Sequence, residues 1–248
     1  PFRKELDLKL VMQANAGPAA ARNTGAVHAK GEFLAFTDDD CTPAPGWLQA
    51  LARFATSHDC AIGGRTVNAL PNNPYATTSH LLIDFIYAYF NVDGKQGRFF
   101  ASNNFALPAD SFRANGGFNT TFRTSEDREL CERWLEQGYR MIYAPEALVY
   151  HAHPLTFRTF WLRHFSYGRG AFRFHQARKV TVKDLLTPDP LRFYLGLHRY
   201  SFSLVRGWRI LLIAPLLLVS HAAYVAGFFS ERITRANHPV ISQGQSPA

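Results

Sequence analysis

The stretch that decides the fold is AKGEFLAFTDDD, residues 29–40. Its apolar run, Phe33–Phe36, follows a glycine and leads directly into three carboxylates, Asp38, Asp39 and Asp40. Short apolar runs bounded by turn residues are typical of buried β-strands. The stretch therefore predicts a buried strand with an acidic turn at its carboxyl end.

The residues before this strand predict a helix and an earlier strand. Gly17-Pro18 opens a helix-forming stretch that ends before Gly31, with proline in its first turn. Upstream, Leu8–Met12 is an apolar run of strand length. Strand, helix and strand in close succession predict a βαβ unit with parallel strands. Helical and strand patterns alternate up to His151, so we expect an α/β fold: a mixed, mainly parallel sheet flanked by helices.

Composition sets limits on the kind of protein. The chain has 248 residues, of which 47% are hydrophobic, which excludes a collagen-like or wholly disordered chain. Three cysteines without a CxxC pair predict neither a zinc site nor a disulfide framework, and indicate a reduced, cytoplasmic setting. The formal net charge is +8, and it is unevenly placed, because residues 151–209 hold 11 basic and 2 acidic side chains.

Two groups of acidic residues are candidates for chemistry. Asp38, Asp39 and Asp40 would repel one another unless a cation such as Mg²⁺ or Mn²⁺ neutralises them, although acidic turns after strands are also common. Glu126 and Asp127 begin a helix predicted over residues 125–137. Carboxylates there complement the helix dipole, and the same geometry suits a general base.

Two histidines, His151 and His153, stand two residues apart at a strand end. Their side chains therefore point to the same side. They are either satisfied polar groups or ligands of a metal ion.

Between residues 8 and 151 the sequence contains an ordered set of motifs: Gly17-Pro18, Ala21-Arg22-Asn23 with Gly25, residues 29–40, Ser102–Leu107, Gly116-Gly117-Phe118, Ser125–Leu130 with Arg133 and Gly138, and Val149-Tyr150-His151. In this order the motifs resemble those of the family 2 glycosyltransferases of GT-A (Rossmann-like) fold.

The resemblance implies roles for individual residues. Asp38 and Asp40 match the outer positions of the DXD motif, and with His151 they are the expected ligands of Mn²⁺ or Mg²⁺. Asp127 matches the catalytic base, with Glu126 beside it. The expected donor-binding residues, some of them at the junction with the acceptor, are Gly17, Arg22, Asn23, Asp38, Asp39, Asn103, Asn104, Gly116 and Gly117.

The implied activity is an inverting, metal-dependent transfer of a sugar from a UDP- or GDP-sugar to a hydroxyl of a lipid-linked or polysaccharide acceptor of the cell envelope. Family members normally begin with a strand and an Asp-rich second strand, and neither precedes Leu8. We therefore expect an N-terminally truncated fragment. The alternatives are an inactive glycosyltransferase-like binding protein and, third, a basic nucleic-acid-binding module.

The chain divides into four expected segments. Residues 1–153 form the catalytic domain, and residues 154–209 form basic, aromatic helices at an anionic membrane surface, which include Tyr167-Gly168-Arg169-Gly170. Residues 210–229 carry no charge and predict a transmembrane or re-entrant helix, with a buried soluble helix as the alternative. Residues 230–248 are a polar tail. We expect the protein at the cytoplasmic face of the cell membrane, with no nucleic-acid partner.

Overall fold

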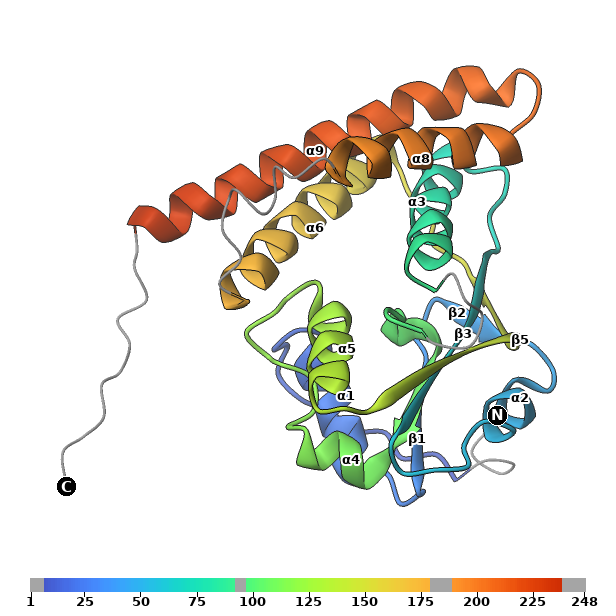
Figure 1. The fold of residues 1–248 in the computed structure, drawn as a ribbon, viewed down its shortest axis with the longest axis vertical. Helices are drawn as coiled ribbons and strands as arrows, with labels where there is room; N and C mark the ends of the chain where they lie inside the picture. The colour runs from blue at the N-terminus through green and yellow to red at the C-terminus, as the bar shows by residue number, and fades with distance from the viewer. Residues whose placement is uncertain (1–6, 92–96, 179–188, 238–248) are drawn as a thin grey trace. The chain divides into compact units, whose positions relative to one another are not determined.

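The computed structural model describes residues 7–91, 97–178 and 189–237. They form two compact units, each described by itself. The first unit combines the residues up to Val67 with Tyr87–His151, and the second combines Asn68–Ile86 with the residues from Ala152 onward. Figure 1 shows the sheet of the first unit and the long helices of the second.

The first unit is built on a five-stranded sheet in the order β1-β4-β3-β5-β2. The strands are β1 (Phe33–Phe36), β2 (Cys41–Pro43), β3 (Cys60–Asn68), β4 (Phe105–Pro108) and β5 (Arg140–His151). Strand β4 pairs with both β1 and β3, and β2 pairs with β5. The register of the last pair sets Cys41 opposite His151, so the acidic turn before β2 meets the end of β5.

Helices accompany this sheet and complete its core. They are α1 (Pro18–His28), α2 (Trp47–Ala52), the short 3₁₀ helix η2 (Ser102–Asn104), α4 (Ala109–Ala114) and α5 (Glu126–Glu136). Large side chains without solvent exposure fill the space between the layers: Phe100, Phe105, Leu107, Leu130, Trp134 and Met141. The predicted α/β class is confirmed.

Two details of the predicted sheet are wrong. Leu8–Met12 is not a strand: the segment has no regular structure, and Leu10 and Met12 are 73% and 88% exposed. The three pairings with a defined register, β1–β4, β3–β4 and β2–β5, are antiparallel instead of parallel. Among the described residues, β1 pairs with β4 and not with a strand at Leu8–Met12, and β4 runs antiparallel to β1.

The second unit is helical. It holds most of α3 (Pro74–Phe90) together with α6 (Phe157–Ala177), α8 (Asp189–Leu204) and α9 (Arg209–Asn237). Helices α6 and α9 lie side by side (Figure 1). They approach so closely that a Cβ on Gly168 would lie 1.9 Å from the Tyr224 carbonyl oxygen, and one on Gly227 would lie 1.9 Å from that of Phe165. Only glycine permits this backbone contact at both positions.

Helix α9 contains the apolar segment predicted over residues 210–229 and extends it at both ends. It is long and apolar enough to cross a membrane by length and composition, with a mean hydropathy of 2.0 over its most apolar part. The first residues of the predicted polar tail, 230–237, continue the helix. The remaining tail residues, 238–248, lie outside the described residues.

Candidate active site

Arg22 on α1 joins two acidic groups that are far apart in the sequence. Its Nη2 donates to the Asp38 carboxylate at 2.6 Å, and its Nη1 donates to Glu126 at 2.8 Å. The Arg22 and Glu126 side chains are only 14% and 8% exposed. Burial alone would lower the pKa of Arg22, but the two carboxylates raise it, so the guanidinium stays charged.

The acidic start of α5 rests on an unusual backbone conformation. Ser125, which precedes Glu126, has φ +68°, and it is the one non-glycine residue with positive φ in the described part of the chain. Such a conformation costs free energy in residues with a side chain and is concentrated at functional sites. It sets the direction in which the first turn of α5 presents Glu126 and Asp127.

The Asp127 carboxylate lies in a place that disfavours its charge. Burial and the neighbouring Glu126 raise the pKa of Asp127 to about 7. Two interactions act in the opposite direction and lower this pKa: the charge of Arg22, and the backbone N–H of Arg128, which donates to Asp127 Oδ1 at 2.8 Å. A carboxyl group whose pKa is near neutrality can exchange a proton with a ligand at physiological pH. This is the electrostatic requirement for the general base predicted here.

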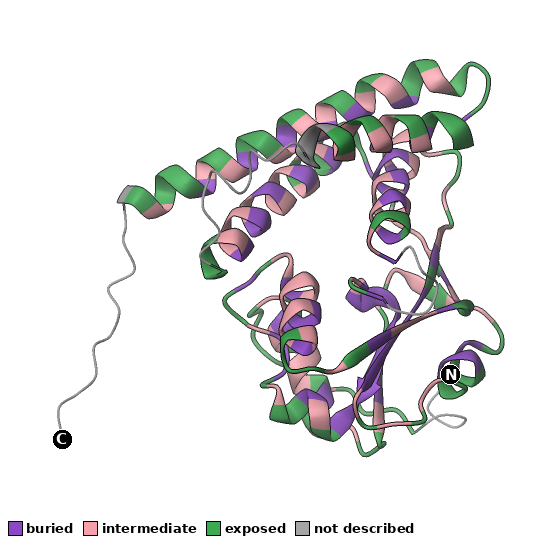
Figure 2. Cartoon of the chain, viewed as in Figure 1, coloured by how far each residue is buried: buried purple, intermediate pink, exposed green. Residues whose placement is uncertain are grey.

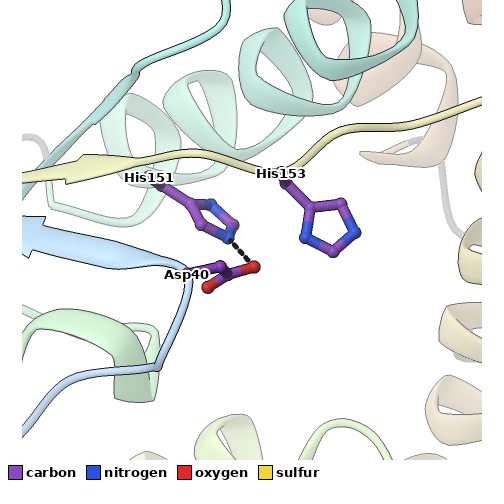
Figure 3. Close-up of side chains that lie close together, drawn as sticks. All are labelled: Asp40, His151 and His153. Atoms are coloured by element: carbon purple, nitrogen blue, oxygen red, sulfur yellow. Dashed lines mark hydrogen bonds and ion pairs between the residues drawn. The ribbon is translucent and has the colours of Figure 1, made fainter.

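Asp40 comes together with His151, the last residue of β5, and with His153, two residues farther along the chain. His151 Nε2 lies 3.0 Å from Asp40 Oδ2, and one ligand atom from each of Asp40, His151 and His153 lies within 4.8 Å of the others (Figure 3). The β2–β5 register accounts for the first contact, and the alternation of side chains along the chain brings His153 to the same side. Asp38 is not in this group, because Arg22 holds it.

The residues of this group fit a divalent metal ion. One carboxylate and two imidazoles form a mixed oxygen and nitrogen donor set of the kind that binds divalent ions. His153 Nδ1 lies 3.1 Å from Nη2 of Arg163. Because the guanidinium can only donate, His153 Nδ1 accepts in this contact, and the same electron pair is the one that a metal ion would bind in place of Arg163.

The remaining predicted donor-binding residues fall into two groups. Asn23 holds the turn before α5, since its amide both donates to the Phe118 carbonyl at 2.8 Å and accepts from the Phe118 N–H at 2.9 Å. Gly116 and Gly117 form this turn with φ +81° and +66°, and a Cβ on Gly117 would lie 2.7 Å from the Asn23 Oδ1. Gly17 also has a positive φ, +93°, just before α1.

Asn103 and Asn104 differ in what they can offer a ligand. The Asn103 Oδ1 accepts from Thr66 at 3.3 Å. Asn104 has no solvent exposure: its Nδ2 donates to the carbonyls of Arg65 and Ala147, and its Oδ1 accepts from the Trp47 indole N–H at 2.8 Å. The structure therefore gives Asn104 a role in joining the strands, and its contact with a donor stays a prediction.

Arg133 is a site residue whose role the sequence did not predict. Its Nη2 donates to the Gly117 carbonyl at 2.7 Å and to Glu129, and its Nη1 contacts the carbonyl of Asn115. It thus ties α5 to the glycine turn. The i,i+4 spacing of Glu129 and Arg133 was the visible signal, but such pairs also occur on ordinary solvent-exposed helices.

Comparison with known proteins identifies several relatives. A pre-mycofactocin glycosyltransferase from Mycobacterium tuberculosis is 33% identical over 165 residues, which are 62% of this chain and 34% of that protein. A glucosyl-dolichyl phosphate glucuronosyltransferase from Haloferax volcanii is 27% identical over 196 residues, covering 71% of this chain and 58% of the relative. The chain thus spans between a third and three fifths of the length of these relatives.

Among solved structures, a mannosyltransferase from Pyrobaculum calidifontis, in complex with GDP-Man and Mn²⁺, matches 90% of this chain and 61% of its own at 20% identity, with a TM-score of 0.48. The model of glycosyl transferase family 2 matches residues 2–116, which include α1, β1 and the acidic turn. Over these residues the chain is similar to glycosyltransferase family 2.

Proposed function

We propose that the chain is an inverting, metal-dependent glycosyltransferase that moves a sugar from a nucleotide-diphosphate donor to an acceptor hydroxyl. The observation that carries this proposal is the position of Arg22, which bonds both to Asp38 in the acidic turn and to Glu126 beside Asp127. A single guanidinium joins the two groups, so they can act on one bound donor.

Asp127 is the proposed base. It takes the proton from the acceptor hydroxyl while the acceptor oxygen forms a bond to the anomeric carbon of the donor. The bond between that carbon and the diphosphate oxygen breaks, and the diphosphate leaves with the electron pair. Attack from the face opposite the leaving group inverts the configuration. The raised pKa of Asp127 supports the role, because a base works best when its pKa lies near the operating pH.

Asp40, His151 and His153 are the proposed ligands of the metal ion. When bound, a divalent ion supplies Lewis-acid stabilisation of the negative charge on a departing diphosphate. Asp38, which is bonded to Arg22, is proposed to contact the ribose of the donor, as the DXD resemblance implies. Asp39, which is exposed in the same turn, is proposed to contact the donor as well.

We propose a UDP- or GDP-sugar as the donor and a lipid-linked glycan as the acceptor. The names of the two relatives point to different acceptors, since one is a pre-mycofactocin glycosyltransferase and the other acts on glucosyl-dolichyl phosphate. The lipid-linked acceptor is favoured by the long apolar helix of the second unit. It would place the enzyme at the cytoplasmic face of the membrane, in the synthesis of a cell-envelope glycan.

The other two functions have less support. A nucleic-acid-binding module has less support because three arginines of residues 151–209 are engaged inside the second unit: Arg169 and Arg173 bind Glu231, and Arg163 contacts His153. A binding protein without activity would have no need of a carboxyl group whose pKa is raised by burial, as that of Asp127 is.

The test is to measure sugar transfer and nucleotide binding separately. Wild-type chain is expected to bind UDP or GDP in the presence of Mn²⁺ and to hydrolyse or transfer from the matching nucleotide sugar. Asp127→Asn is expected to lose at least a hundredfold in rate and keep Mn²⁺-dependent nucleotide binding, whereas Asp40→Asn loses that binding. Asp110→Asn, whose side chain is 92% exposed, is the matched control.

Two results would contradict the proposal. If Asp127→Asn keeps wild-type turnover, Asp127 is not the base. If the wild-type chain binds neither nucleotide in the presence of Mn²⁺, the metal-dependent donor site is excluded.

A further inference from the structure

Helix α9 has two faces of opposite character, and the first is packed inside its own unit. Its buried residues recur every three or four positions and so form one stripe: Ile213, Leu217, Ser220, Ala223, Gly227 and Glu231. Near the start of the helix, Ile213 and Leu217 pack with Leu81 of α3. Farther along, Gly227 lies against the backbone of α6.

The buried stripe ends in an ion cluster. Glu231 is 2% exposed, and its carboxylate accepts from Nε of Arg169 at 2.7 Å, of Arg173 at 2.7 Å and of Arg235 at 3.1 Å. Burial alone would raise the pKa of Glu231, but the arginines outweigh it and lower the pKa to about 2. This face of α9 therefore stays in contact with α6, because separating the helices would leave a buried charge without its partners.

The opposite face of α9 is exposed and apolar. Its residues also recur every three or four positions: Leu211, Pro215, Leu218, Ala222, Val225, Phe229 and Ile233. Leu211, Leu218 and Ile233 are 75%, 63% and 61% exposed. Figure 2 shows the exposed and buried residues alternating along the helix. The stripe runs for about 33 Å at 1.5 Å per residue, and we name it the apolar stripe.

Basic and aromatic residues accompany the apolar stripe. On α8, exposed arginines alternate with exposed apolar side chains at helical spacing: Arg192, Leu195, Arg199 and Phe202. Arg206, which follows the helix, is exposed as well. In the turn between α8 and α9, Trp208 is 69% exposed. Arginines beside leucine, phenylalanine and tryptophan are typical of helices that lie in the interface of an anionic membrane.

We propose that α9 lies flat in the interface of an anionic membrane, with the apolar stripe in the lipid, and that it does not cross the bilayer. A crossing would carry α6 into the hydrocarbon with it, since the two helices are packed together. Arg163, Arg169 and Arg173 of α6 would then enter the hydrocarbon, where a charged side chain is strongly disfavoured. Lying flat buries the exposed face and leaves the ion cluster in the protein. This inference concerns the second unit alone, and its test is independent of the test of sugar transfer.

Vesicle binding tests the surface. The chain is mixed with vesicles of phosphatidylcholine, with or without about a third of phosphatidylglycerol, and the bound fraction is measured by sedimentation. Leu218→Gln with Phe229→Gln is expected to weaken binding to the anionic vesicles at least tenfold. Val27→Gln with Leu48→Gln, which changes two exposed apolar side chains of the first unit, is the matched control and is expected to stay within about twofold of wild type.

Fluorescence quenching by brominated lipids distinguishes lying flat from crossing. Trp208 is compared with a tryptophan placed at mid-helix by Leu218→Trp in a Trp208→Phe background. Both are expected to be quenched most by bromine near the headgroups. Stronger quenching of the mid-helix tryptophan by bromine deep in the chains would overturn the proposal in favour of a spanning helix. A second result would also overturn the proposal. If the wild-type chain does not bind anionic vesicles, and Leu218→Gln with Phe229→Gln instead dissociates a dimer, the apolar stripe binds a second copy of this chain.

Discussion

Replacing Arg22 by methionine is expected to destabilise the first unit strongly. The substitution keeps the length of the side chain but removes its charge, which leaves Glu126, 8% exposed, without its partner. Breaking a buried pair in this way costs about 3–5 kcal/mol. The bond to Asp38 adds less than about 1 kcal/mol, because that carboxylate is one third exposed. We therefore expect the free energy of unfolding to fall by roughly 3–5 kcal/mol.

The measurement is a urea titration followed by tryptophan fluorescence. Trp161→Phe and Trp208→Phe leave Trp47 and Trp134, both in the first unit, as the probes.

Arg113→Met is the control for this measurement, since its partner Asp110 is 92% exposed and the pair is expected to contribute less than about 1 kcal/mol. Equal small losses for the two variants would refute the reasoning. Arg22→Met should also raise the pKa of Asp127 further, because the charge of Arg22 lowers it. The acidic limb of the pH profile of transfer would then move to higher pH.

Three more predictions follow from single residues. Folding raises the pKa of Asp127, so ionisation of Asp127 destabilises the folded protein increasingly as the pH rises from about 4 to 7. Asp127→Asn removes this penalty. In thermal denaturation at pH 8 it is therefore expected to be more stable than wild type by up to about 4 kcal/mol. Gly168→Ala is expected to cost about 1–3 kcal/mol, because its Cβ would collide with the Tyr224 carbonyl, whereas Gly25→Ala, with open space around it, should stabilise by about 0.5–1 kcal/mol. Asn104→Ala removes the partner of an indole N–H and two carbonyls and is expected to cost at least about 2 kcal/mol in urea unfolding.

The sequence predicted those parts of the first unit that depend on local signals. Pro18 starts α1 and Gly138, with φ +79°, follows α5, as their residue types predict. The apolar run Phe33–Phe36 is β1. Asp40 and His151 meet because Asp40 directly precedes β2 and His151 ends β5, and these two strands pair. The order of the motifs already predicted that both strands belong to one domain.

The parts that the sequence did not predict depend on pairing between distant segments. Leu8–Met12 has the composition of a strand, but strand formation also needs a neighbour to bond with, and none accompanies this segment among the described residues. Asp38 was expected beside the metal ion, yet Arg22 of α1 holds it, a choice between two partners that residue spacing does not determine. Arg133 likewise matters through backbone carbonyls, which no side-chain pattern displays.

The arginines of residues 151–209 have two different roles, and the composition of the sequence did not distinguish the two. Arg169 and Arg173 neutralise Glu231, so they hold α9 to α6 and add little to the field at the surface. Arg199 on α8 and Arg206 just after it are exposed and can meet anionic lipid, at about 1 kcal/mol each. Removing the two exposed charges should therefore weaken vesicle binding about thirtyfold and leave the fold intact, whereas Arg169→Gln should loosen the helix pair first. If Arg199→Gln with Arg206→Gln left vesicle binding unchanged, the apolar stripe alone would account for the attachment.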